Sequence, residues 1–397
     1  MADVDLSVEI AGITFKNPII LASGPPTRSA ERIIRAMKYG AAGAVTKTIT
    51  YDVMQQIQPR PRMYVVRPHD ALAGRYYSFY SVDLMSEYEP ERWISEIGKV
   101  KAEVKDGVLI ASIAGRTYEE WSKLAQLVER AGADMVELNV SCPHIEEGEL
   151  MGRAAASDVD IVRHIIKTVK ESTSLPVVVK LTPHGAHPVK LARVAVEAGA
   201  DVLVSTARFQ GLILDVNTMK PILWGGFGGY GGPWQVPISL SWTAHIAMQR
   251  LKVPLIGSGG ISSWRDVLAF ILVGAKATQM CTAIMMHGYQ LIPKLLQGIE
   301  KWMKDKGFAS LEEFRGRALE SIIPLEKLSR KKAYIVKIDR GKCTGCGICV
   351  RVCPYDAIYL DDSRKAVVDH ELCDNCGLCM SLCPTNAISL TVMQHDD

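Results

Sequence analysis

Eight of the ten cysteines in this 397-residue chain lie between residues 343 and 383, in two copies of one pattern. Each copy separates four cysteines by two, two and three residues and ends in proline, at residues 343–354 and 373–384. Thiolates at this spacing are typical ligands of a [4Fe–4S] cluster. A zinc site usually takes its cysteines in two pairs, and a disulfide framework is typical of secreted chains, so neither fits as well. The pattern predicts one-electron chemistry.

The two runs also predict how the ligands are shared. In two-cluster ferredoxins the fourth cysteine of each run binds the cluster of the other run. We therefore expect a first cluster held by Cys343, Cys346, Cys349 and Cys383. We expect a second cluster held by Cys373, Cys376, Cys379 and Cys353.

The composition is that of a globular chain with an unremarkable charge. A hydrophobic fraction of 48% can supply a sizeable core, and a net charge of +3 gives no argument for nucleic acid or an anionic membrane as a partner. No run of ~20 apolar residues could span a bilayer. The first residues lack a basic segment followed by an apolar one, so we expect no signal peptide. Because iron–sulfur ligands need reduced thiols, we expect a cytoplasmic protein.

Eight short apolar runs alternate with helical patterns before residue 325. Each run is continuously apolar at its start, as a strand buried on both faces should be. Eight such runs favour a closed (β/α)8 barrel over residues 1–325, with an open doubly wound sheet as the alternative. Residues 326–397 would then form a linker and a ferredoxin-type domain with two [4Fe–4S] clusters. The expected strands are residues 18–23, 43–48, 108–113, 135–141, 176–182, 202–206, 254–258 and 278–282.

Polar side chains close many of these runs. In a barrel the carboxyl ends of the strands form one face, where active sites lie. The two lysines need an anionic or acceptor partner when buried, which a cofactor ring, a phosphate or a core salt bridge could supply. Residues 257–260 and 281–283 fit the phosphate site that follows the last two barrel strands. The polar residues at strand ends are Ser23, Lys47, Asn139, Lys180, Ser205, Thr206 and Ser258.

The glycine-rich stretch 225–232 contains GxG fragments but opens no helix after a strand. We interpret it as a flexible barrel loop over the cofactor. Without a dinucleotide fingerprint elsewhere, the electrons must come from or go to a separate protein. We expect that redox partner to be a ferredoxin or an FAD- and NAD(P)-binding subunit, within a homo- or hetero-oligomer.

These residues resemble the flavin barrel of the dihydropyrimidine and dihydroorotate dehydrogenases. The resemblance rests mainly on residues 22–24, 46–48, 137–144, 180–183 and 280–284. It covers nearly the whole chain, because the pyrimidine-reducing enzymes also carry a twin-cluster segment after the barrel. The resemblance implies an FMN site at Ala22, Ser23, Lys47, Asn139, Lys180, Ser205, Thr206, Gly229, Gly259, Gly260 and Thr282.

The substrate side departs from the pyrimidine enzymes. Ala155 stands where that family has a general-acid cysteine, and alanine cannot donate a proton. Ser81 and Ala207 stand where asparagines clasp the ring amides, so only Asn139 of that set remains. A site that loses such hydrogen-bond partners loses several kcal/mol of discrimination. The departures predict a substrate other than a plain pyrimidine.

Other polar residues could take over the missing roles. Arg208 could pair a substrate carboxylate bidentately, or form a salt bridge at the barrel rim. His144 and Ser157 lie in or beside the loop after the fourth strand and are candidate proton donors, although either could be structural. The expected substrate-binding residues are Ser81, Asp83, Asn139 and Arg208.

The expected protein is therefore an FMN and iron–sulfur oxidoreductase. It would act on a carbon–carbon bond conjugated to a carbonyl, where hydride transfer builds enolate charge that Asn139 or Arg208 could stabilise. Two alternatives stay open: the catalytic subunit of an NAD-dependent dihydropyrimidine dehydrogenase, and an electron-transfer subunit whose barrel has lost its chemistry.

Overall fold

The computed structural model describes residues 4–67, 76–140, 156–184, 186–328 and 334–392. The chain divides into two compact units, residues 1–322 and 323–397. This division lies close to the boundary that the end of the barrel pattern indicates.

The first unit is a closed barrel of eight parallel strands, in the order β10-β15-β16-β3-β4-β7-β8-β9. This confirms the (β/α)8 prediction. Nearly every barrel-strand residue is buried, because helices cover the outside and packed side chains fill the inside. The strands are β3 (Ile19–Leu21), β4 (Gly43–Val45), β7 (Val108–Ile113), β8 (Met135–Leu138), β9 (Val177–Lys180), β10 (Val202–Val204), β15 (Leu255–Ser258) and β16 (Ala277–Met280).

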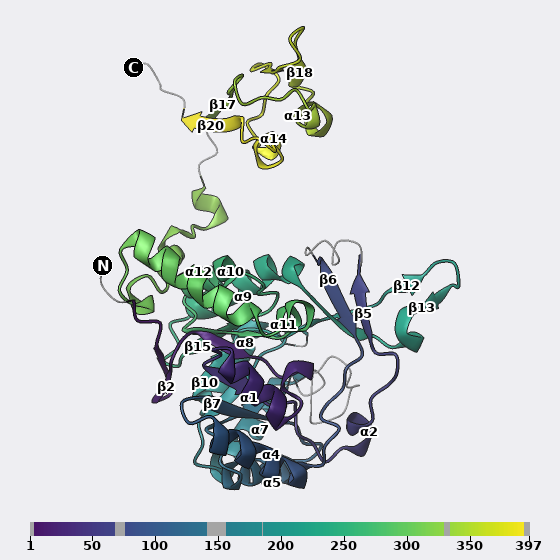
Figure 1. Cartoon of the computed structure of the whole chain (residues 1–397), viewed down its shortest axis with the longest axis vertical. Helices are drawn as coiled ribbons and strands as arrows, with labels where there is room; N and C mark the ends of the chain where they lie inside the picture. Colours follow the sequence, from purple (N-terminus) through teal and green to yellow (C-terminus); the bar gives the residue numbers. More distant parts are fainter. Residues whose placement is uncertain (1–3, 68–75, 141–155, 185, 329–333, 393–397) are drawn as a thin grey trace. The chain divides into compact units, whose positions relative to one another are not determined.

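The helices surround the strands (Figure 1), and some of them begin and end at recognisable signals. Helix α5 (Tyr118–Arg130) starts after Thr117, whose hydroxyl accepts the Glu120 N–H at 3.2 Å. The chain leaves α5 at Gly132, which has a φ of 92° that favours glycine. The other helices are α1 (Ala30–Lys38), α2 (Val53–Gln56), α4 (Pro90–Glu103), α7 (Val159–Ser172), α8 (Pro188–Glu197), α9 (Val236–Ala247), α10 (Trp264–Leu272), α11 (Thr282–His287) and α12 (Leu291–Lys306).

A second sheet has four antiparallel strands, in the order β11-β14-β6-β5. Two of its strands, β6 and β14, contribute residues to a pocket at the carboxyl ends of the barrel strands. Its strands are β5 (Met63–Val66), β6 (Ser78–Ser81), β11 (Phe209–Gly211) and β14 (Gly228–Gly231). The glycine-rich stretch is therefore partly a strand, where a loop was expected. The packing explains the glycines: a Cβ at Gly228 would lie 2.5 Å from the Tyr80 ring.

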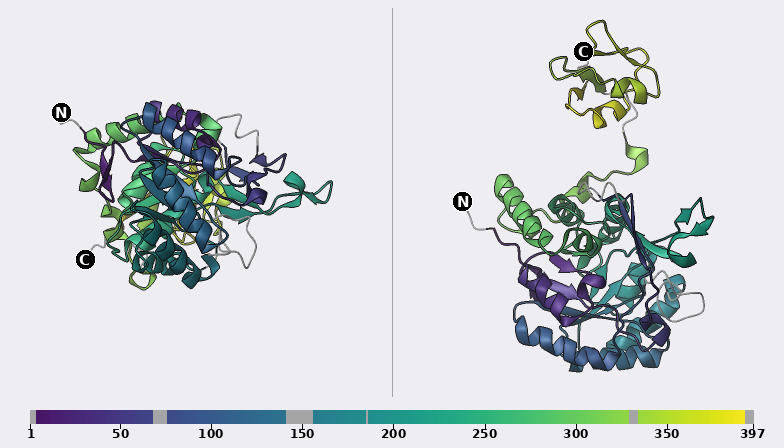
Figure 2. Two further views of the ribbon diagram at one scale, coloured as in Figure 1. Left: turned by 90° about the horizontal axis from the view of Figure 1, so that it is seen from below. Right: turned by 45° about the vertical axis from the view of Figure 1, so that its right-hand side comes forward.

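Two short hairpins complete the unit. One joins β1 (Val8–Ile10) to β2 (Ile13–Phe15). The other joins β12 (Leu214–Asp215) to β13 (Lys220–Pro221) and projects from the unit in Figure 1 and in the right-hand view of Figure 2. Among the described residues, no helix is long and apolar enough to cross a membrane.

The second unit is small and internally repeated. Strand β17 (Tyr334–Ile338) pairs with β20 (Ile388–Val392), and β18 (Ile358–Leu360) pairs with β19 (Ala366–Val368). Two short helices, α13 (Ile348–Val352) and α14 (Leu378–Ser381), each carry the third cysteine of a run. The cysteines therefore lie in two equivalent turn-and-helix segments.

Candidate functional site

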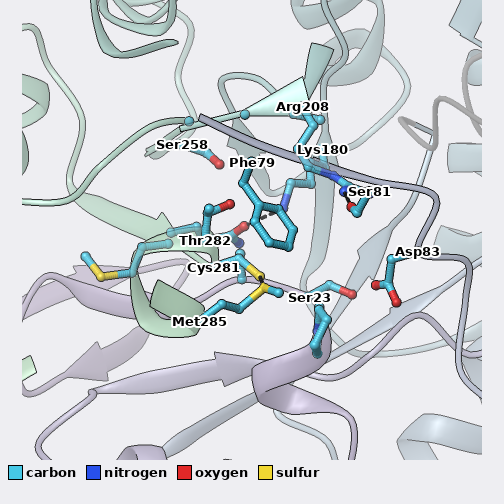
Figure 3. Close-up of a pocket in the computed structure, with 18 of the residues that line it drawn as sticks. Ser23, Phe79, Ser81, Asp83, Lys180, Arg208, Ser258, Cys281, Thr282 and Met285 are labelled. Atoms are coloured by element: carbon cyan, nitrogen blue, oxygen red, sulfur yellow. Dashed lines mark hydrogen bonds between the residues drawn. The ribbon is translucent and has the colours of Figure 1, made fainter. Parts of the chain in front are cut away.

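A pocket opens at the carboxyl ends of the barrel strands, where the polar strand ends predicted it. It contains about 1110 Å³ of space, with the solvent in its open mouth included. Residues at the carboxyl ends of the barrel strands line it, together with residues of β6 and β14. Figure 3 labels Phe79 and Ser81 of β6 among them. Three cations and two carboxylates line it, namely Lys47, Lys180, Arg208, Asp83 and Glu137. The lining therefore favours an anionic ligand.

Lys47 follows β4 and forms a buried ion pair with Asp83, which follows β6. The Arg62 guanidinium lies 3.1 Å from the other oxygen of Asp83. Burial alone would raise the pKa of Asp83, but the charges of Lys47, Arg208 and Arg62 outweigh it and lower that pKa. Asp83 is therefore an anion that orients the cations around it.

Lys180, the last residue of β9, takes part in a buried chain across the barrel. Its ammonium donates to Gln279 Oε1 at 2.8 Å, and Gln279 Nε2 donates to Glu137 Oε2 at 2.7 Å. Glu137 Oε1 lies 3.7 Å from the Lys180 nitrogen. The two buried lysines thus have protein carboxylates nearby, the salt-bridge alternative that the sequence left open, while both also line the pocket.

Arg208 reaches the pocket from the segment between β10 and β11. Its Nη1 donates to Ser81 Oγ at 2.5 Å, as the dashed line in Figure 3 shows. The guanidinium lies against the backbone of Gly229, where a Cβ would come within 2.5 Å of Cζ. Because arginine has five N–H donors, the bond to Ser81 leaves this side chain able to pair with a carboxylate.

Another part of the pocket lining is a glycine cradle after β15. Gly259 and Gly260 have φ angles of 107° and 81°. A Cβ on Gly259 would meet Ser239 Oγ at 2.3 Å, and one on Gly260 would meet the Gly232 carbonyl at 2.7 Å. The Ser239 hydroxyl is buried and has no hydrogen-bond partner among the described residues. Exposed backbone and spare donors at such a cradle suit a phosphate group.

The second unit contains two small hollows, each bordered by four cysteines. Cys343, Cys346, Cys349 and Cys383 line the first. Cys353, Cys373, Cys376 and Cys379 line the second. Each hollow thus draws three cysteines from one run and the fourth from the other, which is the exchange that the sequence pattern predicts. Among the described residues, no three His, Cys, Asp or Glu side chains are grouped as a single metal ion would require.

The comparisons with known proteins agree with both units. Residues 5–303 match the family model described as dihydroorotate dehydrogenase. The chain belongs to the dihydroorotate dehydrogenase family. Residues 330–390 match a 4Fe-4S dicluster domain. As a member of this family with that domain, the protein is an iron–sulfur oxidoreductase acting on CH–CH bonds.

Three relatives show how far the similarity extends. The NAD-dependent dihydropyrimidine dehydrogenase subunit PreA of Escherichia coli is 32% identical over 90% of this chain and 87% of its own length. The catalytic subunit of dihydroorotate dehydrogenase B (NAD(+)) from Pyrococcus furiosus is 35% identical over 79% of this chain and 99% of its own length. The chloroplastic dihydropyrimidine dehydrogenase (NADP(+)) of Arabidopsis thaliana is 29% identical over 80% of this chain and 78% of its own length.

Most of the cofactor residues expected for this dihydroorotate dehydrogenase family member line the pocket. They are Ala22, Ser23, Lys47, Asn139, Lys180, Gly259, Gly260 and Thr282. Ser205 and Thr206 are fully buried, and Ser205 Oγ accepts a bond from Thr243 Oγ1 at 2.9 Å. Gly229 lies behind Arg208. The roles of all eleven residues in binding a cofactor stay predictions.

The expected substrate residues converge on the pocket, and of the two expected proton donors only Ser157 belongs to the described residues. Ser81, Asp83, Asn139 and Arg208 all line the pocket. His144 lies outside the described residues, as does Ala155. Ser157 is exposed, just before α7, and does not contribute to the described pocket lining.

Several pocket residues were not predicted from the sequence. Glu137 is two residues before Asn139, so a period of two places it on the same side of the chain, which is a usable signal. Gln279 has no such signal, because its partners come from β8 and β9 on another side of the barrel. Cys281 was expected only as part of the phosphate-site stretch 281–283, and it lines the pocket. Burial raises the pKa of the Cys281 thiol to about 11, so it stays protonated near neutral pH.

Proposed function

We propose that this protein is an FMN-dependent oxidoreductase that acts on a carbon–carbon bond conjugated to a carbonyl. We further propose that its substrate carries a carboxylate and is not a plain pyrimidine. The observation that carries the proposal is Arg208, a cation that donates to Ser81 and lines the same pocket as the lysines at the strand ends. When bound, FMN would supply hydride exchange with carbon and single-electron exchange with iron–sulfur clusters.

The pocket residues suit FMN in both charge and shape. The cradle at Gly259 and Gly260 would hold the phosphate, with Ser239 and Thr282 as nearby hydroxyl donors. Lys47 and Lys180 would face the flavin ring, where a cation stabilises the negative charge of the reduced ring. Eight cysteines around two hollows would hold two [4Fe–4S] clusters.

Arg208 and Asn139 would bind the substrate. Asn139 Nδ2 donates to Thr48 Oγ1 at 2.9 Å, which orients its amide in the pocket. Arg208 would pair with the carboxylate, and the Asn139 amide would stabilise the oxygen on which enolate charge develops. Ser81 and Ala207 offer fewer ring-amide contacts than the asparagines of pyrimidine enzymes, so a neutral pyrimidine would bind weakly.

A partner protein would supply or accept the electrons. The sequence shows no strand–glycine loop–helix fingerprint for NAD(P). NADH or NADPH alone should therefore not reduce the protein, whereas a reduced ferredoxin or an FAD-containing subunit should. Rapid reduction by NAD(P)H without a second protein would refute this part of the proposal.

A second candidate is the catalytic subunit of an NAD-dependent dihydropyrimidine dehydrogenase. The 32% identity to the Escherichia coli subunit over 90% of this chain favours it. The pocket substitutions at Ser81 and Ala207 argue against it.

The test is anaerobic reoxidation of the reduced flavin by a panel of enoates, enones and pyrimidines. We expect enoates with a free carboxylate to reoxidise it faster than their amides or esters, and uracil and thymine to be poor oxidants. Arg208→Met should remove the preference for the carboxylate, and Arg208→Lys should restore it in part. Uracil turnover at an ordinary enzymatic rate of ~1–1,000 s⁻¹ would favour the second candidate.

A further inference from the structure

The iron–sulfur unit is built from two halves that repeat after thirty residues, so that Cys343 corresponds to Cys373. The correspondence extends to individual hydrogen bonds. Asp339 N donates to the Ala387 carbonyl at 2.7 Å, and Asp369 N donates to the Ala357 carbonyl at 2.8 Å. The Asp339 and Asp369 carboxylates each accept from the N–H two residues later at 2.9 Å. The two halves are therefore near copies, and each residue in one has a counterpart in the other.

The first departure from this symmetry is a cation. Lys365 precedes β19, and its ammonium donates to the carbonyl oxygen of Cys343 at 2.5 Å. Its counterpart in the other half is Ile335, which is uncharged. The first hollow, lined by Cys343, Cys346, Cys349 and Cys383, thus has a cation at one of its ligands where the second hollow has none in the corresponding place.

The second departure is an anion. Asp374 lines the second hollow, and its counterpart Thr344 lines the first. The Asp374 carboxylate accepts a hydrogen bond from the Tyr355 hydroxyl, at the edge of the same hollow. The second hollow therefore has a negative charge at the position where the first hollow has a neutral hydroxyl side chain.

The third departure concerns hydrogen bonds to sulfur. Ala366 N donates to Cys343 Sγ at 3.5 Å, and Ala387 N donates to Cys383 Sγ at 3.2 Å. Both thiols belong to the first hollow. The counterpart of Ala366 is Val336, whose N–H donates at 3.2 Å to the side-chain oxygen of Asn375. The Val336 N–H therefore donates to the Asn375 side chain, whereas its counterpart, the Ala366 N–H, donates to a cysteine sulfur.

We propose that the two cluster sites are unequal, and that the site of Cys343, Cys346, Cys349 and Cys383 has the higher reduction potential. Each site takes one electron and no proton, so reduction adds one negative charge. A nearby cation and N–H donors stabilise that charge, and a nearby carboxylate destabilises it. An electron entering the unit would therefore reside at the Cys343 site, and the Cys373 site would be the stronger reductant. The inference rests on the two-cluster assignment under Proposed function.

The test uses the full-length protein with its clusters, titrated with dithionite in the absence of oxygen and followed by EPR. We expect two one-electron transitions. Cys346→Ser and Cys376→Ser replace the exposed ligand of each site and identify which transition belongs to which site. Cys346→Ser should alter the transition at higher potential.

Variants that remove one charge then test whether these charges cause the difference in potential. Lys365→Ile should lower the potential of the Cys343 site, changing the electron distribution at least tenfold, which is 59 mV for one electron. Asp374→Asn, which keeps the shape, should raise the potential of the Cys373 site. Lys365→Met serves if the isoleucine variant does not fold. The matched controls Lys337→Gln and Asp362→Asn remove the same charges from exposed positions outside both hollows and should shift the potentials less.

The outcomes distinguish an error in the assignment of potentials from an error in the proposed cofactors. If Cys346→Ser alters the lower transition, or if Lys365→Ile shifts the potential no more than Lys337→Gln does, the assignment is wrong. Two clusters of equal potential would refute the assignment alone. A protein without two clusters would refute the proposed cofactors as well, and iron analysis of the same sample shows which has failed.

Discussion

The two units use their polar groups in opposite ways. In the barrel, buried charged groups pair with one another: Lys47 with Asp83, and Lys180 with Glu137 through Gln279. The barrel also has a core of dozens of aliphatic and aromatic side chains, and no ligand is part of that core. Among the described residues of the iron–sulfur unit, the buried core holds ten, and four of them are cysteines of the cluster runs. A unit this small usually depends on a metal for stability. The barrel should therefore fold around an empty pocket, whereas the second unit should fold around its clusters.

Removing iron gives the largest expected effect. A chelator with an oxidant, applied to the full-length protein, should unfold residues 334–392 and leave the barrel folded, because only the second unit has its ligands in its core. Limited proteolysis with mass spectrometry should then show cleavage within residues 334–392 and protection of residues 5–303. Protection of both units after complete iron loss would contradict the comparison.

The crossed ligands sharpen the same point. Because Cys383 lines the hollow of the first run and Cys353 that of the second, Cys383→Ala should damage the cluster whose other ligands are Cys343, Cys346 and Cys349. Cys353→Ala should damage the other cluster. EPR of the reduced proteins distinguishes the two. Loss of the cluster in the mutated run itself would show that the ligands do not cross.

The Lys47–Asp83 pair should matter more to the barrel than a surface pair does. Lys47→Met leaves a buried carboxylate with fewer counter-charges, a change that typically costs ~3–5 kcal/mol of unfolding free energy. It should also lower FMN retention. The control Lys123→Met breaks an exposed pair with Glu119 and should leave the thermal midpoint unchanged. Equal midpoints for the two variants would mean that the buried pair contributes nothing to stability.

The same pair predicts an acid limit for the barrel. The pKa of Asp83 is lower in the folded protein than its ordinary value of 3.8. Its contribution to stability is therefore fully present above that value and is lost as the pH falls through the folded pKa. The thermal midpoint of the wild type should fall more steeply below about pH 4 than that of Asp83→Asn. Parallel curves would exclude Asp83 as a source of the acid sensitivity.

The smallest effect concerns a helix cap distant from either site. Thr117→Ala removes the hydroxyl that accepts the Glu120 N–H at the start of α5. It should lower the unfolding free energy of the barrel by ~1 kcal/mol. Flavin content, iron content and EPR spectra should not change, because this contact belongs to the scaffold alone. Thr117→Ser keeps the hydroxyl and should restore most of the stability.

The sequence predicted what depends on local pattern. Buried strands such as Val108–Ile113 and the two cysteine runs carry their signals within a few residues. Pairings that need barrel closure could not be predicted: Glu137, Lys180 and Gln279 come from three strands and meet only across the interior. The stretch 225–232 looked like a loop because glycine is rare in strands. Only the packing of Tyr80 and Arg208 against this segment shows why three of the four residues of β14 (Gly228–Gly231) are glycines.

The glycine at position 229 of β14 also sets how close the Arg208 guanidinium can lie to the sheet. The three atoms nearest to a methyl group at Gly229 would all belong to the guanidinium of Arg208, the far end of a flexible side chain. Glycine at this position does not have the positive φ that an alanine would resist. A methyl group at position 229 should therefore move the Arg208 guanidinium, the cation that we propose binds the substrate carboxylate. Selectivity for charged or neutral substrates could in this way change during evolution, or in a designed variant, while every pocket-lining residue stays the same.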